Sequence, residues 1–480
     1  MRKTIMFIVV TVLVLFVAVT SVHSASLPKL TYYEAAIQFS DNTNPNGSWS
    51  YGFTRKLGGS FTSYAINGFS DSGDGWYGYT LGETPMLVTQ HLGFDPHYLY
   101  LHPGPSNEPS VARWTAPSGG TFNFFGNFYG FDPDYGSDVY VLKNNVSVYH
   151  DTLSFMGDQK NFSLALTLRK GDRIDFVVAT LPSNPMGGGF AGVTVLAAPQ
   201  LFHFTSVEFP GVPNTGVFGL NNLGDIVGRY RGADNVRHGF IRHKGVFTTI
   251  DYPGAAHTYL ISINDLGQIL GYTWNEDFTV SGSFLYSNGT FTDLSYPGAV
   301  STVLSDINDL AYITGYYDAG NYMYSGFVRS PDANYFSFEV PGSCSGSTTP
   351  SGMNLLGQIA GSYLDASCYS SYGFLRNPNG KFTNVSFPGA VDGTALYAIN
   401  GWGGIEGSYC GLGGSGDISH CQNFVAVGSN FVPVWLPGAD YIGTQLNLDG
   451  INDRGQVVAW YLDANNAYHS FTGTPIVPLR

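Results

Sequence analysis

The second half of the chain repeats one pattern six times. Each copy has a β-rich run that ends in Pro-Gly, a stretch of small residues, an asparagine-centred turn and a strand that begins before a phenylalanine. The prolines of these pairs are Pro210, Pro253, Pro297, Pro341, Pro388 and Pro437, and the turn asparagines are Asn221, Asn264, Asn308, Asn354, Asn400 and Asn452. Repeats of about 43 to 52 residues with four short strands are typical of the blades of a β-propeller.

An early strand is expected to complete the last copy. The first Pro-Gly follows a lone strand, His203–Phe209, whereas the last copy ends at Phe471 with no outer strand after it. An open array would leave strand edges unpaired, so we expect the N-terminal strand to close a six-bladed β-propeller over residues 202–473. In the third copy the predicted strands are Ser301–Ile307, Ala311–Tyr317, Tyr324–Arg329 and Tyr335–Val340.

Residues 27–198 contain no copy of this pattern. Runs with period-two hydrophobicity begin at Gly120, Asp138, Phe162 and Ile174, and turn-forming residues separate them. This alternation predicts an all-β domain, a jelly-roll-like β-sandwich, and Ala197–Gln200 is expected to be the linker to the propeller.

The first 24 residues are typical of an export signal. Arg2 and Lys3 precede an apolar run over residues 5–19, and Val22 and Ser24 are small enough for cleavage. An uncleaved anchor is the alternative, because this run approaches the roughly 20 residues that span a bilayer. We expect a secreted, periplasmic or cell-surface monomer with no membrane span after signal removal.

The acidic charge excludes one class of partner. The formal net charge is −14, and such a surface repels the phosphates of nucleic acids and anionic lipids. No nucleic-acid partner is therefore expected.

The four cysteines predict two local disulfides. In an exported chain an even number of cysteines favours pairing, and Cys344 and Cys368 lie in one repeat while Cys410 and Cys421 flank a glycine-rich hairpin tip in the next. We expect the pairs Cys344–Cys368 and Cys410–Cys421, since neither a Cys-x-x-Cys motif nor a nearby histidine cluster suggests a redox or metal role.

Several strings resemble known repeats. Ile263-Asn-Asp-Leu-Gly-Gln-Ile-Leu-Gly-Tyr, His238-Gly-Phe-Ile and Phe247-Thr-Thr-Ile-Asp-Tyr-Pro-Gly resemble the HAF-type extracellular repeats of exported bacterial proteins, a family that implies a propeller. Leu101-His-Pro-Gly-Pro and Val111-Ala-Arg-Trp-Thr-Ala-Pro resemble jelly-roll accessory domains similar to carbohydrate-binding modules. Neither resemblance implies a catalytic residue set.

The predicted sandwich offers two candidate sites. The first is a sugar-binding site, because aromatic rings beside turn residues can stack on sugars. Its predicted rings are Trp49, Tyr51, Trp76 and Tyr77, with His102 and Arg113 as polar contacts. Packing in the core is the alternative for each ring. Three carboxylates, Asp132, Asp134 and Asp138, are spaced as a calcium-binding loop could be, and an ordinary turn is the alternative. No other cofactor is expected.

The repeats show no catalytic motif. The recurring Asp265, Asp309 and Asp453 are interpreted as turn residues rather than cation ligands. The residue two before each repeat proline is expected on a solvated outer face: Glu208, Asp251, Ser295, Glu339, Ser386 and Trp435.

Three functions remain open. The first is non-enzymatic binding of a glycan or an extracellular partner. The second is a propeller glycoside hydrolase or polysaccharide lyase in which Asp392, Glu406 and Asp440 converge near the axis. The third is a structural scaffold of the cell envelope that binds a protein.

Overall fold

The computed structural model describes most of the chain after the predicted signal. The described residues are 33–35, 38–40, 43–70, 73–77, 86–90, 98–104, 107–182, 189, 191–212, 214–276, 280–320, 322–388, 390, 393–410, 421–436, 446–463 and 467–476. Every regular element among them is a β-strand, so the all-β prediction is confirmed. None of these residues belongs to a helix with the length and hydrophobicity that a bilayer crossing requires. The predicted signal, residues 1–24, lies outside the described residues.

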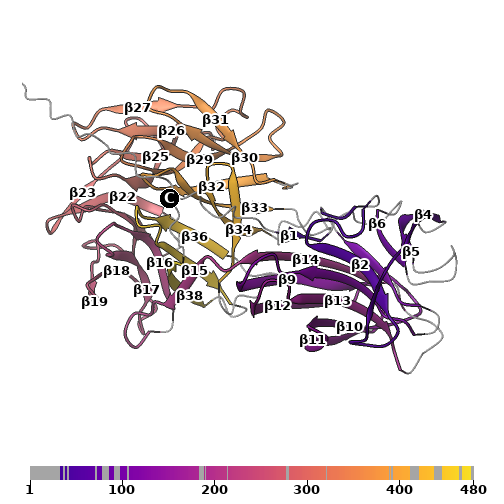
Figure 1. The fold of residues 1–480 in the computed structure, drawn as a ribbon. Coiled ribbons are helices and arrows are strands. Elements are labelled where there is room, and N and C mark those ends of the chain that lie inside the picture. Colours follow the sequence, from indigo (N-terminus) through magenta and orange to yellow (C-terminus); the bar gives the residue numbers. More distant parts are fainter. Residues whose placement is uncertain are drawn as a thin grey trace, which may run out of the picture.

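The first fourteen strands form two antiparallel sheets, coloured indigo to purple in Figure 1. One sheet has the order β12-β9-β14-β7-β6-β5-β4, with β1 also on β14, and the other has the order β11-β10-β13-β8-β2-β3. Their bounds are β1 Tyr33–Glu34, β2 Trp49–Thr54, β3 Phe61–Ser63, β4 Ile66–Ser70, β5 Gly73–Tyr77, β6 Met86–Gln90, β7 Leu99–His102, β8 Ser110–Thr115, β9 Gly120–Gly130, β10 Ser137–Lys143, β11 Val146–Leu153, β12 Gln159–Leu168, β13 Arg173–Thr180 and β14 Ala191–Pro199.

A shared apolar core joins these two sheets. Trp49 and Trp114 of the six-stranded sheet are buried in one cluster with Phe124 and Phe128 of the eight-stranded sheet. Alternate residues of a strand point to opposite faces, which is why the period-two pattern places one apolar face of each sheet inside.

The remaining strands form six repeat units of four strands each. Their bounds are β15 Phe202–Ser206, β16 Thr215–Leu220, β17 Ile226–Arg231, β18 Arg237–His243, β19 Val246–Thr249, β20 His257–Ile263, β21 Ile269–Trp274, β22 Val280–Ser287, β23 Thr290–Asp293, β24 Ser301–Ile307, β25 Ile313–Asp318, β26 Tyr324–Arg329, β27 Tyr335–Phe338, β28 Thr349–Met353, β29 Ile359–Leu364, β30 Ser371–Arg376, β31 Phe382–Val385, β32 Gly393–Ile399, β33 Gly404–Cys410, β34 Gln422–Val427, β35 Asn430–Val434, β36 Leu446–Ile451, β37 Val457–Leu462 and β38 Tyr468–Pro475.

The first five repeat units are consecutive: β16–β19, β20–β23, β24–β27, β28–β31 and β32–β35. One parallel bridge, between Ser371 and Gly393, joins the fourth unit to the fifth. In the third unit, β24 and β26 match the predicted strands, whereas β27 ends at Phe338 rather than at the predicted Val340 and β25 starts two residues later than predicted. The cause is Ala311, whose φ of 60° places it in the turn before the strand.

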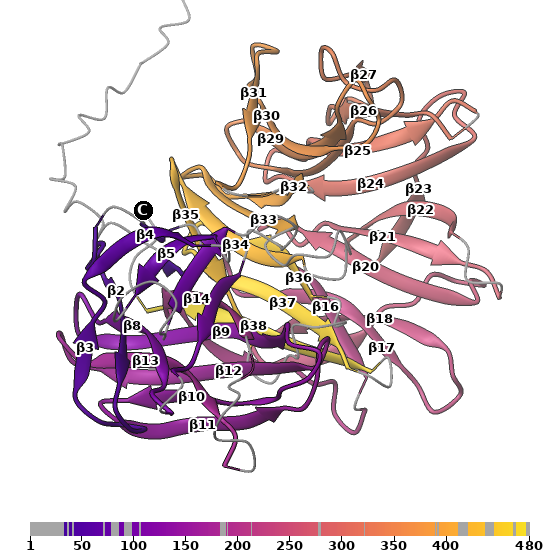
Figure 2. The ribbon, with the colours of Figure 1, turned by 90° about the vertical axis from the view of Figure 1, so that its right-hand side faces the viewer.

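The sixth repeat unit combines the two ends of the repeat region. Its order is β15-β38-β37-β36, and β15 pairs antiparallel with β38 from Phe202 opposite Pro475 to Ser206 opposite Phe471. The early strand is therefore the outer strand of the last unit, although it ends at Ser206 rather than at the predicted Phe209. Figure 2 shows β38 and β37 between the purple sheets and the magenta β16 and β17.

The turn asparagines link each repeat unit to the next. The side-chain amide of Asn221 donates to the carbonyl of Asn264 at 3.2 Å, and the remaining steps have the same form. The acceptors in order are Asn308 at 3.0 Å, Asn354 at 3.2 Å, Asn400 at 3.0 Å, Asn452 at 3.1 Å and, from Asn452, Asn221 at 3.0 Å. This chain of hydrogen bonds has no end, because the sixth unit bonds back to the first.

The connection between the two parts of the chain is shorter than predicted. Ala197, Ala198 and Pro199 belong to β14 and pair with β9, so only Gln200 and Leu201 separate β14 from β15. The outer face of the eight-stranded sheet packs against the fifth and sixth repeat units, where Phe125 stacks on Trp435 with 4.5 Å between ring centroids.

The contact with Phe125 buries Trp435, which lies two residues before a repeat proline, where the sequence predicts an exposed residue. The five equivalent residues, from Glu208 to Ser386, are exposed as predicted, whereas Trp435 is buried in this contact.

Candidate functional site

The innermost strand of every repeat unit has a β-bulge at the same position. The bulged residue lies three places before the turn asparagine and differs in each unit: Phe218, Ile261, Ser305, Ser351, Tyr397 and Asp449. All six line a central cavity of about 110 Å³ that is shared by the six units. Bulges redirect side chains and are common near binding sites, so the variable residues of the repeat face this cavity.

One acid in the central cavity has a structural role. Asp306 accepts hydrogen bonds from the Ser262 hydroxyl at 2.6 Å, the Ile307 amide at 2.9 Å and the Met353 amide at 2.8 Å. Burial raises the pKa of Asp306, although these three donors oppose the rise. The carboxylate therefore connects the second, third and fourth repeat units.

A second acidic group lies where the fifth and sixth units meet. Glu406 of β33 is fully buried at a position that other units fill with Val227, Leu270, Thr314, Ala360 and Val458. Burial raises the pKa of Glu406 well above its ordinary value, and the nearby Asp449 carboxylate raises it further. Asp449 lines the central cavity and accepts a hydrogen bond from the Trp460 indole, while burial raises the pKa of Asp449 to about 7.

Only one of the three predicted axial acids can be placed. Glu406 is fully buried on the second strand of the fifth unit and is not among the residues that line the central cavity, and Asp392 and Asp440 lie outside the described residues. The partner of Glu406 is Asp449, which the repeat pattern could have indicated because it is the one acid among the bulged residues.

The repeated aspartates bond to the neighbouring turns. Asp265 accepts from the Asn222 amide at 2.7 Å, Asp309 from the Asp265 amide at 2.7 Å and Asp453 from the Gly401 amide at 2.6 Å. These bonds support the interpretation of the three residues as turn residues.

A larger pocket lies at the opposite end of the repeat units from the asparagine turns. It has a volume of about 420 Å³, and we call it the arginine pocket, lined by Phe218, Arg229, Arg237, Tyr259, Ile261, Tyr272, Trp274, Leu462 and Tyr468. Arg237 and Tyr468 begin β18 and β38, and Trp274 ends β21, which places the pocket at the ends of these strands. The first, second and sixth repeat units thus contribute to it.

Aromatic rings form most of the wall of the arginine pocket. Tyr259 stacks on Trp274 with 4.8 Å between centroids and 18° between planes. Phe218 lies edge-on to Tyr468 at 6.4 Å. Such rings bury large areas, and the tyrosine and tryptophan residues also carry polar groups, a combination that suits a ligand with both apolar faces and hydroxyls.

Arg229 is the buried cation of this pocket. It is 3% exposed, and its guanidinium carbon lies 4.3 Å from the Tyr468 ring centroid and 4.8 Å from that of Tyr259. Its Nε has no hydrogen-bond acceptor among the described residues, and burial lowers the pKa of Arg229. Other units have Tyr272, Tyr316, Ser362, Ser408 or Trp460 at this position, so a lone arginine in the repeat alignment was the available sequence signal.

Three of the six predicted sugar-binding residues, Trp49, Tyr51 and Arg113, are buried in the N-terminal sheets. Trp49 is 1% exposed and Tyr51 is fully buried, so both rings belong to the core and cannot stack on an external sugar. Arg113 is buried and bonds to both oxygens of Asp175, at 2.6 and 2.8 Å. His102 is partly buried against the Pro103 carbonyl at 2.6 Å, and the side chains of Trp76 and Tyr77 lie outside the described residues.

The predicted calcium loop is also corrected. The Asp132 carboxylate accepts from the amides of Asp134 and Tyr135 at 2.9 and 3.0 Å, which is the geometry of a side-chain turn. Asp138 instead bonds to the Thr152 hydroxyl at 2.7 Å, on the neighbouring strand. Across the described residues, no group of three or more acidic, histidine or cysteine side chains is arranged to hold a metal ion.

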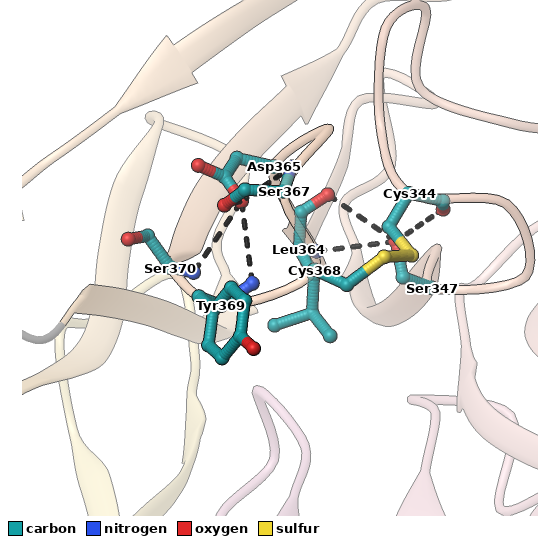
Figure 3. Close-up of a disulfide and its surroundings, with 8 residues drawn as sticks. All are labelled: Cys344, Ser347, Leu364, Asp365, Ser367, Cys368, Tyr369 and Ser370. Carbon is teal, nitrogen blue, oxygen red and sulfur yellow. Dashed lines mark hydrogen bonds between the residues drawn. A yellow bond between two sulfur atoms is a disulfide. The ribbon is translucent and has the colours of Figure 1, made fainter.

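Both predicted disulfides are present. Cys344 pairs with Cys368 and Cys410 with Cys421, and no described cysteine is free. Figure 3 shows the first pair beside Ser347, whose hydroxyl donates to the Cys344 carbonyl at 2.7 Å. Asp365 accepts from the Ser367 hydroxyl at 2.5 Å in the same loop. The disulfide joins the loop between β29 and β30 to the segment that precedes β28.

No family model and no curated protein matches this chain. Among solved structures it is similar to a subtype N11 neuraminidase-like protein of A/flat-faced bat/Peru, with 10% identity and a TM-score of 0.34 over 57% of this chain and 94% of that one. It is also similar to a family 35 carbohydrate binding module from an environmental isolate, with 14% identity and a TM-score of 0.17 over 31% of this chain and 92% of that one. A CBM4 structure gives 13% identity and a TM-score of 0.16 over 24% of this chain and 89% of that one. At these TM-scores the similarities carry no argument about function.

Proposed function

We propose that the protein is an extracellular, non-enzymatic glycan-binding protein and that the arginine pocket is its binding site. In this proposal β15–β38 are a closed six-bladed β-propeller of HAF-type repeats, and β1–β14 are a jelly-roll-like accessory domain. The observation that carries the proposal is the aromatic wall of the arginine pocket, formed by residues that the repeats do not share. Residues that build the fold of a repeat recur in every copy, whereas residues that bind a ligand can differ from copy to copy.

The chemistry of the pocket suits a sugar. The C–H faces of a pyranose ring pack well on a flat aromatic surface such as the Tyr259–Trp274 stack, while its hydroxyls need polar partners at the edges. A volume of about 420 Å³ is within the range of small-ligand sites and can hold one or two sugar rings.

Two further features support an extracellular location and a closed ring. Disulfides form and persist in oxidising compartments, and this chain has two. Pairing of β15 with β38 and the bond from Asn452 to Asn221 both join the sixth repeat unit to the start of the repeats, which leaves no unpaired edge there.

Binding can be tested with the full mature chain on an array of neutral and acidic oligosaccharides, followed by calorimetry with the best ligand. Trp274→Ala should weaken binding at least tenfold, because it removes one ring of the stack. Phe336→Ala is the matched control, since Phe336 is an exposed aromatic residue of β27 outside the pocket. Retention of no glycan, or equal affinity for wild type and Trp274→Ala, would contradict the proposal.

Glycoside hydrolysis is the second candidate, favoured by Glu406 and Asp449. Glycosidases use two carboxyl groups, one protonated as the acid and one ionised as the base or nucleophile. Glu406 and Asp449 are neighbours, and the pKa of Glu406 is raised well above its ordinary value while that of Asp449 is raised to about 7, which would let Glu406 hold the proton. Release of reducing sugar that is lost in both Glu406→Gln and Asp449→Asn, with binding retained, would support this candidate over simple binding.

A further inference from the structure

We propose that the ligand of the arginine pocket is an acidic sugar and that Arg229 binds its carboxylate. This inference rests on the proposed glycan-binding function and specifies the class of glycan. It depends on the charge of the pocket, whereas the proposed function depends on its aromatic wall.

The first argument is the missing counter-charge of Arg229. A buried charge is costly unless it is paired, and the chain contains a paired example for comparison. Arg113 is 7% exposed and makes two bonds to Asp175, whereas Arg229 is 3% exposed and has no carboxylate within ion-pair distance among the described residues. The Tyr259 and Tyr468 rings offset part of the cost through cation–π contacts but do not neutralise the charge.

A second cation faces the same cavity. Arg237 also lines the pocket, and its guanidinium bonds to the Tyr259 hydroxyl at 2.5 Å. Its charge lowers the pKa of Arg229 further, after the larger effect of burial. A pair of arginines in a low-dielectric cavity creates a local positive potential in a chain whose net charge is −14.

The third argument is geometric. A guanidinium is planar and presents its donors in a fork that matches the two oxygens of a carboxylate. The Nε of Arg229 is a buried donor without an acceptor, as is the indole Nε1 of Trp274 in the same pocket. The Tyr259 ring contacts both the Arg229 guanidinium and the Trp274 ring. A uronic acid could therefore stack its ring on the aromatic wall while its carboxylate meets Arg229.

The test compares sugars that differ only in charge. Oligomers of galacturonate, glucuronate and mannuronate, each with its methyl ester, are titrated into the full mature chain by calorimetry at low and high salt. We expect at least tenfold tighter binding of one free acid than of its ester, and weaker binding of that acid as the salt concentration rises. Sulfated oligosaccharides form an additional arm, and tighter binding of these than of every uronate would overturn the carboxylate assignment.

Variants separate this inference from the proposed function. Arg229→Gln should abolish the preference for the acid over the ester. Arg237→Gln, at a partly exposed residue, should reduce this preference, and it serves as the test if Arg229→Gln does not fold. Arg242→Gln, outside the pocket, is the control and should keep the preference. If acid and ester bind equally well and Trp274→Ala weakens the binding of both, the inference is overturned but the proposed function stands. If no sugar binds, both proposals are overturned.

Discussion

The side-chain amide of Asn452 donates a 3.0 Å hydrogen bond to the carbonyl of Asn221, a residue 231 positions earlier in the chain. Five bonds of the same form join the other turns, and in those the partners are between 43 and 52 positions apart. The same type of asparagine bond thus joins consecutive repeat units in five places, and in the sixth it joins the last repeat unit to the first. Two contacts therefore join the last repeat unit to the start of the repeat region. One is the bond from Asn452 to Asn221 at the turns, and the other is the pairing of β15 with β38 at the outer strand.

Asn452→Ala should destabilise the repeat region by about 1–3 kcal/mol, because it removes one of the two donors to the Asn221 carbonyl and leaves only the 3.3 Å bond from the Gly224 amide. The side-chain oxygen of Asn452 also accepts from the amides of Arg454 and Gln456 at 3.0 and 2.9 Å, and these bonds are lost as well. The measurement is the urea midpoint followed by tryptophan fluorescence. Asn334→Ala, at an exposed asparagine, should stay within about 0.5 kcal/mol of wild type, and an equal effect of both variants would contradict the role of Asn452.

Trp435→Ala should weaken the contact between the two parts of the chain. Trp435 is 6% exposed and stacks on Phe125 of β9, so its loss should cost about 3–5 kcal/mol. Limited proteolysis near Gln200 and thermal unfolding would report the change. Ser386→Ala, at the equivalent exposed position of the preceding repeat unit, is the control, and unchanged proteolysis of Trp435→Ala would refute this prediction.

Removal of one disulfide should lower stability without altering the fold. Cys344 and Cys368 are 24 residues apart, and a loop of this length corresponds to about 3.5 kcal/mol in the chain-entropy model. The double variant Cys344→Ser and Cys368→Ser should therefore melt at a lower temperature than wild type under oxidising conditions. The same variant of Cys410 and Cys421, which are 11 residues apart, should lose slightly less, and the opposite order would argue against the entropic explanation.

Glu406 and Asp449 should make stability fall as the pH rises. In the unfolded chain Asp449 loses its proton near pH 4, whereas burial raises its pKa in the folded protein to about 7. Between these values the folded state holds more protons than the unfolded state, so its contribution is greatest at pH 4 and is lost by about pH 7. Glu406, whose pKa is raised further by Asp449, extends the loss to higher pH.

Glu406→Gln tests this pH dependence. The variant should be more stable than wild type at pH 8, and the difference should shrink towards pH 4, where both side chains are neutral. Melting temperatures of both proteins from pH 4 to 8 provide the measurement. Asp332→Asn, at an exposed residue of the third repeat unit, is the control, and a parallel profile for wild type and Glu406→Gln would rule out the buried pair as the cause.

Local signals explain what could be predicted from the sequence. The strands β24 and β26 of the third repeat unit and the two disulfides depend on residues close in sequence, whose spacing limits the possible geometry. The sequence predicts Glu406 as a candidate acid, but the apolar and neutral residues at its position in the other units show why its burial is exceptional. The predictions for Trp49 and Arg113 were wrong because they depended on whether the side chain is buried. The sequence pattern around an aromatic or arginine residue can be the same in a core as at a surface.

By itself, the sequence determined the strand periodicity, the turn chemistry, the six copies and the cysteine pairs, because each of these depends on contacts within about one repeat. The tertiary structure alone decided which variable residues meet. It placed Arg229 beside Tyr468 and Glu406 beside Asp449, and it buried Trp435 against Phe125. The physical reason is that a side chain's partners and solvation depend on how distant strands pack, and neither follows from the periodicity of one strand.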